Sequence, residues 1–341
     1  MQINIALSGF GHVGRAFGGL LAEKHTDLTR RYGLDMRLVL AANSRGAVHD
    51  GGGLDLKFLE SLAQGGELAD MPGFTEGLTG PEAVALSRAS VWVEATPSHA
   101  KASFEPGMSN IKKALGDGMH AVTLCKGPLV HNFAEIMGIA QAAGTKVKYS
   151  GATAAALPTV DVAVNSLAGS RITSIEGILN GTSNFILTCM EREGLSFAQG
   201  LAEAQRRGIA EPEPSLDVEG WDTAYKLLII ANTLFEKTFS LSDMAVEGIT
   251  RVGAADLKEA GNSGGTLKLV GSAELRKEAC VLKTGPKFLP FEHPLAGVSG
   301  TTKGIHFVSD TMGPLTVIGG YSNPRGAAAA ALKDIISLYM L

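Results

Sequence analysis

A glycine-rich turn near the start of the chain constrains the fold more than any other feature. Residues 2–8 are predicted to form a short buried strand, and Gly9-Phe10-Gly11-His12-Val13-Gly14 follows them directly. Beyond the turn, apolar residues recur with helical spacing at positions 13, 17, 20 and 21. This order of strand, glycine turn and helix is the context in which G-x-G-x-x-G predicts dinucleotide binding.

The three glycines of this turn have separate physical roles. Gly9 permits the tight turn, Gly11 lets the backbone approach a pyrophosphate, and Gly14 lets the helix pack closely on the strand. The N-terminus of the helix adds free N–H groups and a positive potential, both of which favour phosphate. The predicted cofactor-binding residues of the turn are therefore Gly9, Phe10, Gly11, His12, Val13 and Gly14.

Predicted strands and helices alternate through the first 150 residues. Strands are predicted at 36–42, 90–95, 120–124 and 146–149, and helical patterns fall near 111–115 and 132–142. Such alternation is typical of a parallel sheet with helices on both faces. We expect an α/β protein in which residues 1–150 form a Rossmann-type dinucleotide-binding domain.

The second half of the chain lacks this strict alternation, which favours an α+β domain. A predicted strand at 172–179 precedes helical patterns at 183–193, 196–207 and about 218–235, and short strands follow at 279–284, 305–309 and 315–318. We expect residues 151–304 to bind the substrate and to form a dimer. The stretch 305–341, which ends in an alanine-rich helix, is expected to return to the first domain.

The composition limits the classes of protein to which the chain can belong. Its 341 residues suffice for about two domains, and a 45% hydrophobic share with a net charge of −4 excludes a largely disordered chain. A nucleic-acid-binding protein would usually show a basic surface. The three cysteines lack disulfide or zinc spacing, and there is neither a signal-peptide pattern nor an apolar run long enough for a membrane helix. The sequence therefore predicts a cytoplasmic protein without nucleic-acid or membrane partners.

The segment from Glu211 to Lys226 gathers charged residues in a pattern that predicts a polar site. Five carboxylates fall within residues 211–222, and Asp217 stands where it would cap the helix that follows. Asp222 and Lys226 are four residues apart, so they share one helix face. Because the helix becomes almost wholly apolar after Lys226, we expect this lysine to be partly buried, which suits it to proton transfer. The alternative is a solvated helix start with a surface ion pair.

Two further candidates follow predicted parallel strands, at the sheet edge where open α/β folds bind ligands. Lys126 comes after the strand 120–124, and Thr96-Pro97-Ser98 comes after the strand 90–95. We expect the lysine to lie in the active site and to contact the cofactor. We expect the threonine, proline and serine to meet the ribose or the nicotinamide of the cofactor. Ordinary surface turns are the alternative in both places.

The end of the second strand bears on the choice between NAD and NADP. A chain that binds NAD usually has an acid at this strand end, about 20 residues past the glycines. Asp35 has the spacing but precedes the strand, and the residues after the strand are Asn43-Ser44-Arg45. Ser44 can hydrogen-bond a 2′-phosphate and Arg45 can pair with it. We therefore predict a preference for NADP, with NAD as a usable cofactor; the alternative is a solvated Arg45 and equal use of both.

Taken together, these segments resemble those of homoserine dehydrogenases, and the resemblance spans nearly the whole chain. It rests on the glycine turn, on Asn180-Gly181-Thr182-Ser183-Asn184-Phe185-Ile186-Leu187, and on residues 210–226. Shorter matching stretches are residues 45–47, 53–56, 95–98, 125–128 and 293–298.

The resemblance implies an enzyme that interconverts L-homoserine and L-aspartate 4-semialdehyde with a nicotinamide cofactor, in the biosynthesis of threonine and methionine. It implies that Lys126 and Lys226 form the acid–base pair at the substrate oxygen. It also implies a homodimer and a cofactor contact at Gly320. The substrate-binding residues that it implies are Gly181, Thr182, Glu211, Asp217 and Asp222.

The sequence departs from the family pattern at a loop that relatives use for a sodium ion. Ser150 stands where relatives often carry a glutamate. This argues against a monovalent cation site, for which the carbonyls of Thr153 and Ala155 would remain as ligands. The chain also has no segment for a regulatory or kinase domain, so threonine feedback through such a domain is not expected.

Two other functions stay open at this point. The same scaffold can act on another amino- or hydroxy-substrate, and a chain of this kind can be a cofactor-binding sensor without catalysis. The segment 211–226 favours homoserine over other substrates. The presence of both Lys126 and Lys226 argues against a sensor.

Overall fold

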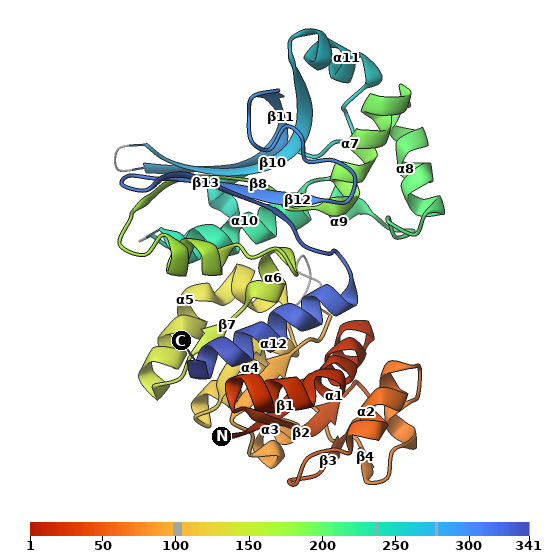
Figure 1. Ribbon diagram of the computed structural model, residues 1–341, viewed down its shortest axis with the longest axis vertical. Coiled ribbons are helices and arrows are strands. Elements are labelled where there is room, and N and C mark those ends of the chain that lie inside the picture. Colours follow the sequence, from red (N-terminus) through yellow and green to blue (C-terminus); the bar gives the residue numbers. More distant parts are fainter. Residues whose placement is uncertain (98–103, 236, 277–278, 341) are drawn as a thin grey trace. The chain divides into compact units, whose positions relative to one another are not determined.

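The chain folds into two units, each built around its own sheet. The computed structural model describes residues 1–97, 104–235, 237–276 and 279–340. Unit 1 comprises Met1–Ala152 together with Asn323–Leu341, and unit 2 comprises Thr153–Ser322 (Figure 1). The two sheets confirm the α/β class that the sequence predicts. No helix in the described ranges is long and apolar enough to cross a membrane.

Unit 1 contains a seven-stranded sheet in the order β4-β3-β2-β1-β5-β6-β7. The strands are β1 (Gln2–Ser8), β2 (Asp35–Ala42), β3 (Gly46–His49), β4 (Phe74–Glu76), β5 (Val91–Glu94), β6 (His120–Thr123) and β7 (Val147–Lys148). The five predicted strands pair in parallel, as expected. The sequence analysis missed β3 and β4, which pair antiparallel, so the sheet is mixed rather than purely parallel.

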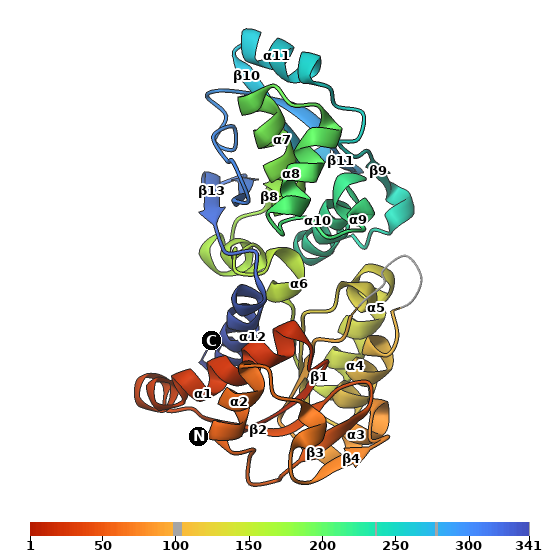
Figure 2. The ribbon, with the colours of Figure 1, turned by 90° about the vertical axis from the view of Figure 1, so that its right-hand side faces the viewer.

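Helices cover both faces of this sheet. They are α1 (His12–Tyr32), α2 (Leu56–Ala63), α3 (Gly80–Ser87), α4 (Gly107–Gly116), α5 (Lys126–Ala143) and α12 (Pro324–Met340), and a short α6 (Ser150–Ala154) ends the first run of this unit. Figure 2 shows α1 and α12 on one side of the sheet and α3 and α4 on the other. Because small buried residues such as Ala328 and Ala331 line α12, it packs closely against α1 and the apolar core around β1.

Unit 2 contains a six-stranded sheet in the order β13-β12-β8-β10-β11-β9. The strands are β8 (Ile172–Ile178), β9 (Met244–Val246), β10 (Gly265–Arg276), β11 (Ala279–Pro290), β12 (Lys303–Ser309) and β13 (Gly313–Gly319). The expected return of residues 305–322 to the first domain is wrong, because β12 pairs with β8 and β13 pairs with β12. The chain joins unit 1 again only at Asn323.

The helices of unit 2 are α7 (Gly181–Glu193), α8 (Phe197–Arg206), α9 (Ser215–Val218), α10 (Trp221–Leu234) and α11 (Ala254–Asn262). Shorter helical turns occur at Leu68–Asp70 in unit 1 and at Val162–Ser166 and Leu241–Asp243 in unit 2. The long helix expected from about residue 218 begins at Trp221, because Gly220 has a φ of 87° and so interrupts the helical backbone. Asp217 therefore lies in α9 and does not cap α10, contrary to expectation. The helix α10 packs on β8, β10 and β11, where Gly271 leaves room for Thr223 and Leu227.

Candidate active site

The residues that the sequence nominates fall into two sets, one in each unit. The cofactor set, which includes the glycine turn and Lys126, lies in unit 1. The substrate set lies in unit 2, around the start of α7 and the start of α10. Gly320, nominated for the cofactor, also belongs to unit 2.

The glycine turn leaves no space for side chains at its first and last glycines. Gly9 has a φ of 91°, and a Cβ there would lie 2.3 Å from the carbonyl carbon of Ala95. A Cβ on Gly14 would lie 2.4 Å from the carbonyl oxygen of Gly9. At Gly11 nothing lies within 4 Å of the Cβ position, and Gly11 is the N-cap of α1. The turn is therefore closely packed at Gly9 and Gly14 and open at Gly11, at the helix N-terminus. An open helix N-terminus is what phosphate binding requires.

The other three residues of the turn are placed differently from one another. The side chain of Phe10 is buried in the core of unit 1, under the guanidinium of Arg15, and its N–H donates to the carbonyl of Ala42 at 3.0 Å. Phe10 thus anchors the turn to the core of unit 1. Because its side chain and its N–H are both engaged there, only its carbonyl could contact a cofactor directly. His12 is exposed and Val13 is half-buried at the start of α1.

A buried carboxyl group that the sequence analysis missed fixes the turn after β5. Glu94 has no exposed surface and accepts hydrogen bonds from Trp92 Nε1 at 3.0 Å, Asn110 Nδ2 at 2.9 Å and the backbone N–H of Thr96 at 3.1 Å. The hydroxyl of Thr96 also donates to it. Burial raises the pKa of Glu94, against these hydrogen bonds. The structure therefore holds Thr96 and the exposed Pro97 in a fixed turn, while Ser98 lies outside the described residues.

The strand end that bears on cofactor choice carries no acid. The side chain of Asn43 accepts from the N–H of Arg45 at 2.8 Å and closes a tight turn from β2 into β3, in which Ser44 and Arg45 are exposed. Asp35 begins β2, at the opposite end of the strand, and its carboxylate binds Arg37 at 2.7 Å. The guanidinium lowers the pKa of Asp35. The structure thus confirms that Asp35 is at the wrong end of the sheet for a ribose.

Lys126 stands at the N-terminus of α5, directly after β6. It is half-buried, and Cys125, the N-cap residue, is buried. The N–H of Cys125 donates to the hydroxyl of Thr123 at 3.1 Å. The strand end therefore presents the lysine, and not the thiol, toward solvent.

Asn180 is the centre of the substrate set in unit 2. It ends the segment after β8 and caps α7 by accepting from the N–H of Ser183 at 2.8 Å. Its side-chain amide donates to Asp217 at 2.6 Å and to Asp222 at 2.8 Å. The sequence analysis named Asn180 only as part of the segment 180–187; its bridge between two carboxylates depends on the packing of α7, α9 and α10. One amide thus draws two of the five acids of the 211–226 segment toward the start of α7.

Lys226 joins this network from α10. Its ammonium lies 2.5 Å from Asp222 and donates to the carbonyl of Leu179 at 2.9 Å. The exposed fractions of the two charged side chains are 14% for Lys226 and 11% for Asp222. The expected burial and the expected pairing along one helix face are confirmed, and the pair is not a solvated surface pair.

The remaining substrate candidates lie around the start of α7 or on the loop before α9. A Cβ on Gly181 would lie 2.9 Å from the carbonyl oxygen of Thr301, so only glycine fits there. The hydroxyl of Thr182 donates to the carbonyl of Ile209 at 3.2 Å. Glu211 is exposed on its loop, and within the described residues its carboxylate is not among the groups that bind Asn180.

A second buried lysine, which the sequence analysis missed, belongs to the same region of unit 2. Lys303 begins β12, is 2% exposed, and donates to the carbonyl of Ala154. Burial and, to a smaller extent, the charge of Lys226 lower the pKa of Lys303 to about 7, while Asp222 opposes the shift. Sequence alone shows a lysine at the start of a strand, which is ordinarily exposed. Only the folded chain reveals its burial.

In the loop linked to sodium in relatives, hydrogen bonds within the chain occupy several of the oxygen atoms. The hydroxyls of Thr153 and Thr159 lie 2.8 Å apart, and Ala154, between the two nominated carbonyl ligands, accepts from Lys303. Ser150 donates from its N–H at 2.9 Å and from its hydroxyl at 2.7 Å to Asp334. Gly320 packs against this loop, since a Cβ there would lie 2.4 Å from the N atom of Leu157. Across the described ranges no group of three or more His, Cys, Asp or Glu is arranged for a metal.

Comparisons with known proteins point to one family. The family model for homoserine dehydrogenase matches residues 158–336. An NAD(+)-dependent homoserine dehydrogenase from Pseudomonas canavaninivorans is 35% identical over 341 residues, which cover 99% of this chain and 96% of that protein. A crystal structure from Archaeoglobus fulgidus, assigned to homoserine dehydrogenase, matches with a TM-score of 0.88 at 33% identity and covers 99% of each chain. A hyperthermophilic archaeal homoserine dehydrogenase mutant in complex with NADPH matches with a TM-score of 0.85 at 25% identity and covers 99% of this chain and 98% of that one.

Proposed function

Because the chain belongs to the homoserine dehydrogenase family and is an NAD(P)-dependent oxidoreductase, we propose which of its residues carry the interconversion of L-homoserine and L-aspartate 4-semialdehyde. The observation that carries the proposal is the shielded ammonium of Lys226, held by Asp222 and by the carbonyl of Leu179. A charged group fixed in this way, on a mostly apolar helix, is prepared for proton transfer at a defined point.

Oxidation of the primary alcohol removes a hydride from carbon and a proton from oxygen. The nicotinamide, when bound, takes the hydride. We assign the proton to Lys226, whose amine accepts it in the unprotonated form and returns it during reduction of the aldehyde. Lys126, at the end of β6 in unit 1, is the second member of the acid–base pair. Asp222 keeps the Lys226 amine in place, because it is one helical turn away on the same face.

The ionic groups of homoserine need partners of opposite charge. Asp217 and Asp222, joined by Asn180, offer negative charge for the substrate ammonium, and Glu211 adds a third carboxylate on the adjoining loop. The first N–H groups of α7, at Gly181 and Thr182, suit the substrate carboxylate, because a helix N-terminus attracts anions.

We infer that NADP is preferred over NAD, although the family uses both. The relatives differ, since one is NAD(+)-dependent and one is in complex with NADPH. In this chain the exposed Ser44 and Arg45 follow β2 without an acid. A serine hydroxyl and a guanidinium can bind a 2′-phosphate, whereas no carboxylate is there to select the free ribose hydroxyl.

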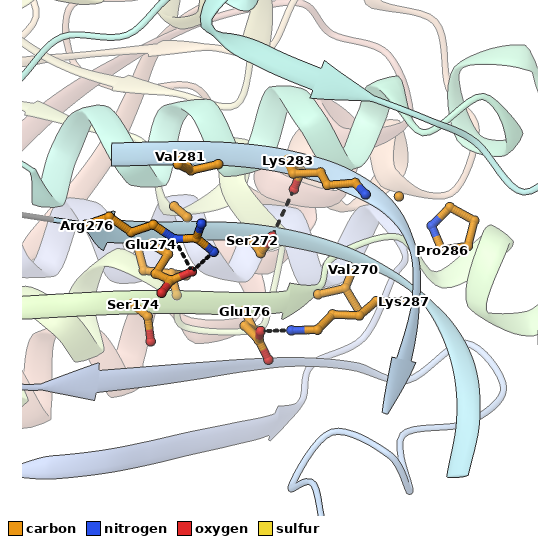
Figure 3. A pocket seen from close by; sticks show the side chains of 13 residues that line it. Ser174, Glu176, Val270, Ser272, Glu274, Arg276, Val281, Lys283, Pro286 and Lys287 are labelled. Atoms are coloured by element: carbon orange, nitrogen blue, oxygen red, sulfur yellow. Dashed lines mark hydrogen bonds and ion pairs between the residues drawn. The ribbon is translucent and has the colours of Figure 1, made fainter. Parts of the chain in front are cut away.

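We further infer a homodimer formed by unit 2. Its sheet has β13 at one edge, and edges of this kind are usually covered. Figure 3 shows the sheet face opposite α10, where Ser174, Ser272 and Val281 line an open hollow of about 520 Å³. Ion pairs within this face, Glu176 with Lys287 and Glu274 with Arg276, neutralise much of its charge. This hollow lies on the far side of the sheet from Lys226, so we assign it to subunit contact and not to substrate.

A substrate panel tests the reaction. Purified protein is mixed with NADP or NAD and with L-homoserine, L-serine, L-threonine or a 2-hydroxy acid, and the absorbance of the reduced nicotinamide is followed at neutral and alkaline pH. Homoserine is expected to give the highest kcat/KM. A higher kcat/KM with another amino- or hydroxy-substrate would show that homoserine is not the preferred substrate. No turnover with any of them would favour a cofactor-binding sensor without catalysis.

A further inference from the structure

The buried amino group of Lys303 has no role in the proposed reaction, yet the fold holds it in place with a hydrogen bond. Lys303 opens β12 with 2% exposure, and its Nζ donates to the carbonyl oxygen of Ala154. The N–H of Leu157 donates to the same oxygen at 3.2 Å. Two donors, one from the sheet and one from the turn itself, therefore fix the backbone of residues 154–157. This turn includes Ala155, a non-glycine residue with a φ of 53°.

The same amino group lies close to the proton-transfer pair. Among the described residues, the charged groups that act on Lys303 are Lys226 and Asp222, both on α10. Asp222 in turn binds Lys226 and Asn180. The residues just before Lys303 pack on the start of α7, because the carbonyl of Thr302 accepts from Asn184 Nδ2 at 3.1 Å and the carbonyl of Thr301 lies at Gly181. A change at Lys303 is therefore expected to reach the network of Asn180, Asp222 and Lys226 through this packing and through charge.

A metal cation in this turn would be held by the carbonyls of Thr153 and Ala155, which flank the oxygen that accepts from Lys303. Hard cations require several oxygen ligands, usually including a carboxylate. Ser150, which stands where relatives often carry a glutamate, has its side chain engaged with Asp334 and with Lys333 at 2.7 Å. We therefore expect Lys303 to fix this turn without a bound cation.

We propose that Lys303 is a positioning residue of the homoserine site: its amino group holds the 154–157 turn while the residues just before Lys303 pack on the start of α7, so that a lysine of the chain, and not a bound metal cation, organises this part of unit 2. The proposal rests on the homoserine dehydrogenase function stated above. It makes two separable claims, one about turnover and one about cations.

The turnover claim is tested with Lys303→Met against Lys268→Met. Lys268 on β10 is also 2% exposed, and its nearest ionic partner, Glu191, is 3.9 Å away on α7. Methionine replaces a buried lysine with little change in volume, and because Lys268 is as buried as Lys303, a loss of stability from the exchange itself would appear in both variants. We expect kcat with homoserine to fall about 10- to 100-fold in Lys303→Met, as for other losses of positioning, with the KM for homoserine and the Kd for NADP nearly unchanged. Lys268→Met is expected to keep wild-type kcat.

The cation claim is tested on the wild-type protein by exchanging sodium chloride for choline chloride at constant ionic strength. We expect neither kcat nor the melting temperature to change. An increase of either with sodium would overturn the claim, as would equal kcat in Lys303→Met and wild type. If wild type itself does not oxidise homoserine, the proposed function fails instead, and the melting temperatures still decide whether a cation binds.

Discussion

At the scale of single residues, Asn180 connects the capping of a helix to the chemistry of the site. We expect Asn180→Ala to lower the free energy of unfolding by about 1–3 kcal/mol, because a helix cap is lost and two carboxylates lose a donor. We also expect kcat with homoserine to fall, since Asp222 loses the amide that binds the same carboxylate oxygen as Lys226. Urea unfolding and steady-state kinetics measure the two effects.

The matched control is Ser196→Ala, which removes the N-cap of α8 in the same unit. This variant is expected to lose about 1 kcal/mol of stability and none of its kcat. Equal kinetics in the two variants would mean that Asn180 is a helix cap and nothing more.

The low pKa of Lys303 makes stability depend on pH in a defined direction. The folded chain releases this proton near pH 7, whereas the unfolded chain keeps it to about 10.5. Between these values the unfolded state binds more protons, so this group makes the free energy of unfolding rise with pH by about 1.4 kcal/mol per unit, and the contribution levels off below pH 7. Lys303→Met should lack this slope, and the exposed Lys258→Met should retain it. Urea unfolding from pH 6 to 10 measures it; parallel curves for wild type and Lys303→Met would contradict the burial of a titrating amine.

What the sequence reveals about these residues depends on how local the signal is. The pairing of Asp222 with Lys226 follows from helix spacing, so it was predictable. The bridge made by Asn180 requires three helices to meet, and the burial of Glu94 and Lys303 depends on neighbours far away along the chain. Those roles had no local pattern from which to infer them.

At the scale of elements, the turn from β2 to β3 is the part of the fold that bears on cofactor choice. We expect Arg45→Ala to raise the Kd for NADP about 10-fold or more, since one charge-assisted contact contributes about 1.5–3 kcal/mol, and to leave the Kd for NAD nearly unchanged. Titrations of cofactor fluorescence measure both constants. Arg37→Ala, at the opposite end of β2, serves as a control that should alter neither. Equal weakening for both cofactors, or a wild-type preference for NAD, would overturn the assignment.

The sequence predicted elements well where a hydrophobic period was uninterrupted. The strands β1, β2, β5, β6 and β7 and the helices α7 and α8 appear within a few residues of their expected places. The short β3, β4 and β9 were missed because three or four residues are too few to show a hydrophobic period. The long β10 was missed although it pairs with β11 over twelve residues, because polar residues on its open face alternate with glycine and alanine.

At the scale of the whole molecule, the assembly follows from the sheet of unit 2. We expect light scattering at micromolar concentration to give twice the chain mass of 35.4 kDa. Ser272→Arg places a charge in the middle of the open face and should shift the mass toward that of a monomer. Ser263→Arg, at the exposed end of α11, should leave the mass unchanged. A monomeric wild-type protein would contradict the dimer. A dimeric Ser272→Arg variant would show that the interface is not on this face of the sheet.

The division of the chain was only partly visible in its sequence. The change from alternating to mixed elements near residue 150 is a local signal, and the units divide between Ala152 and Thr153. The assignment of β12 and β13 was not predictable in this way, because short alternating strands can join either sheet, and their pairing with β8 is a long-range contact.

The central claim is that the shielded Lys226 transfers the proton of homoserine. Its most direct test is the kcat of Lys226→Met with L-homoserine and NADP, measured beside the Kd of NADP for the same protein. The account predicts that kcat falls by about 10²–10⁴, the range for loss of a positioned acid–base group, while the Kd of NADP stays at its wild-type value. Wild-type turnover in this variant would contradict the account and reduce Lys226 to a partner in a structural ion pair with Asp222.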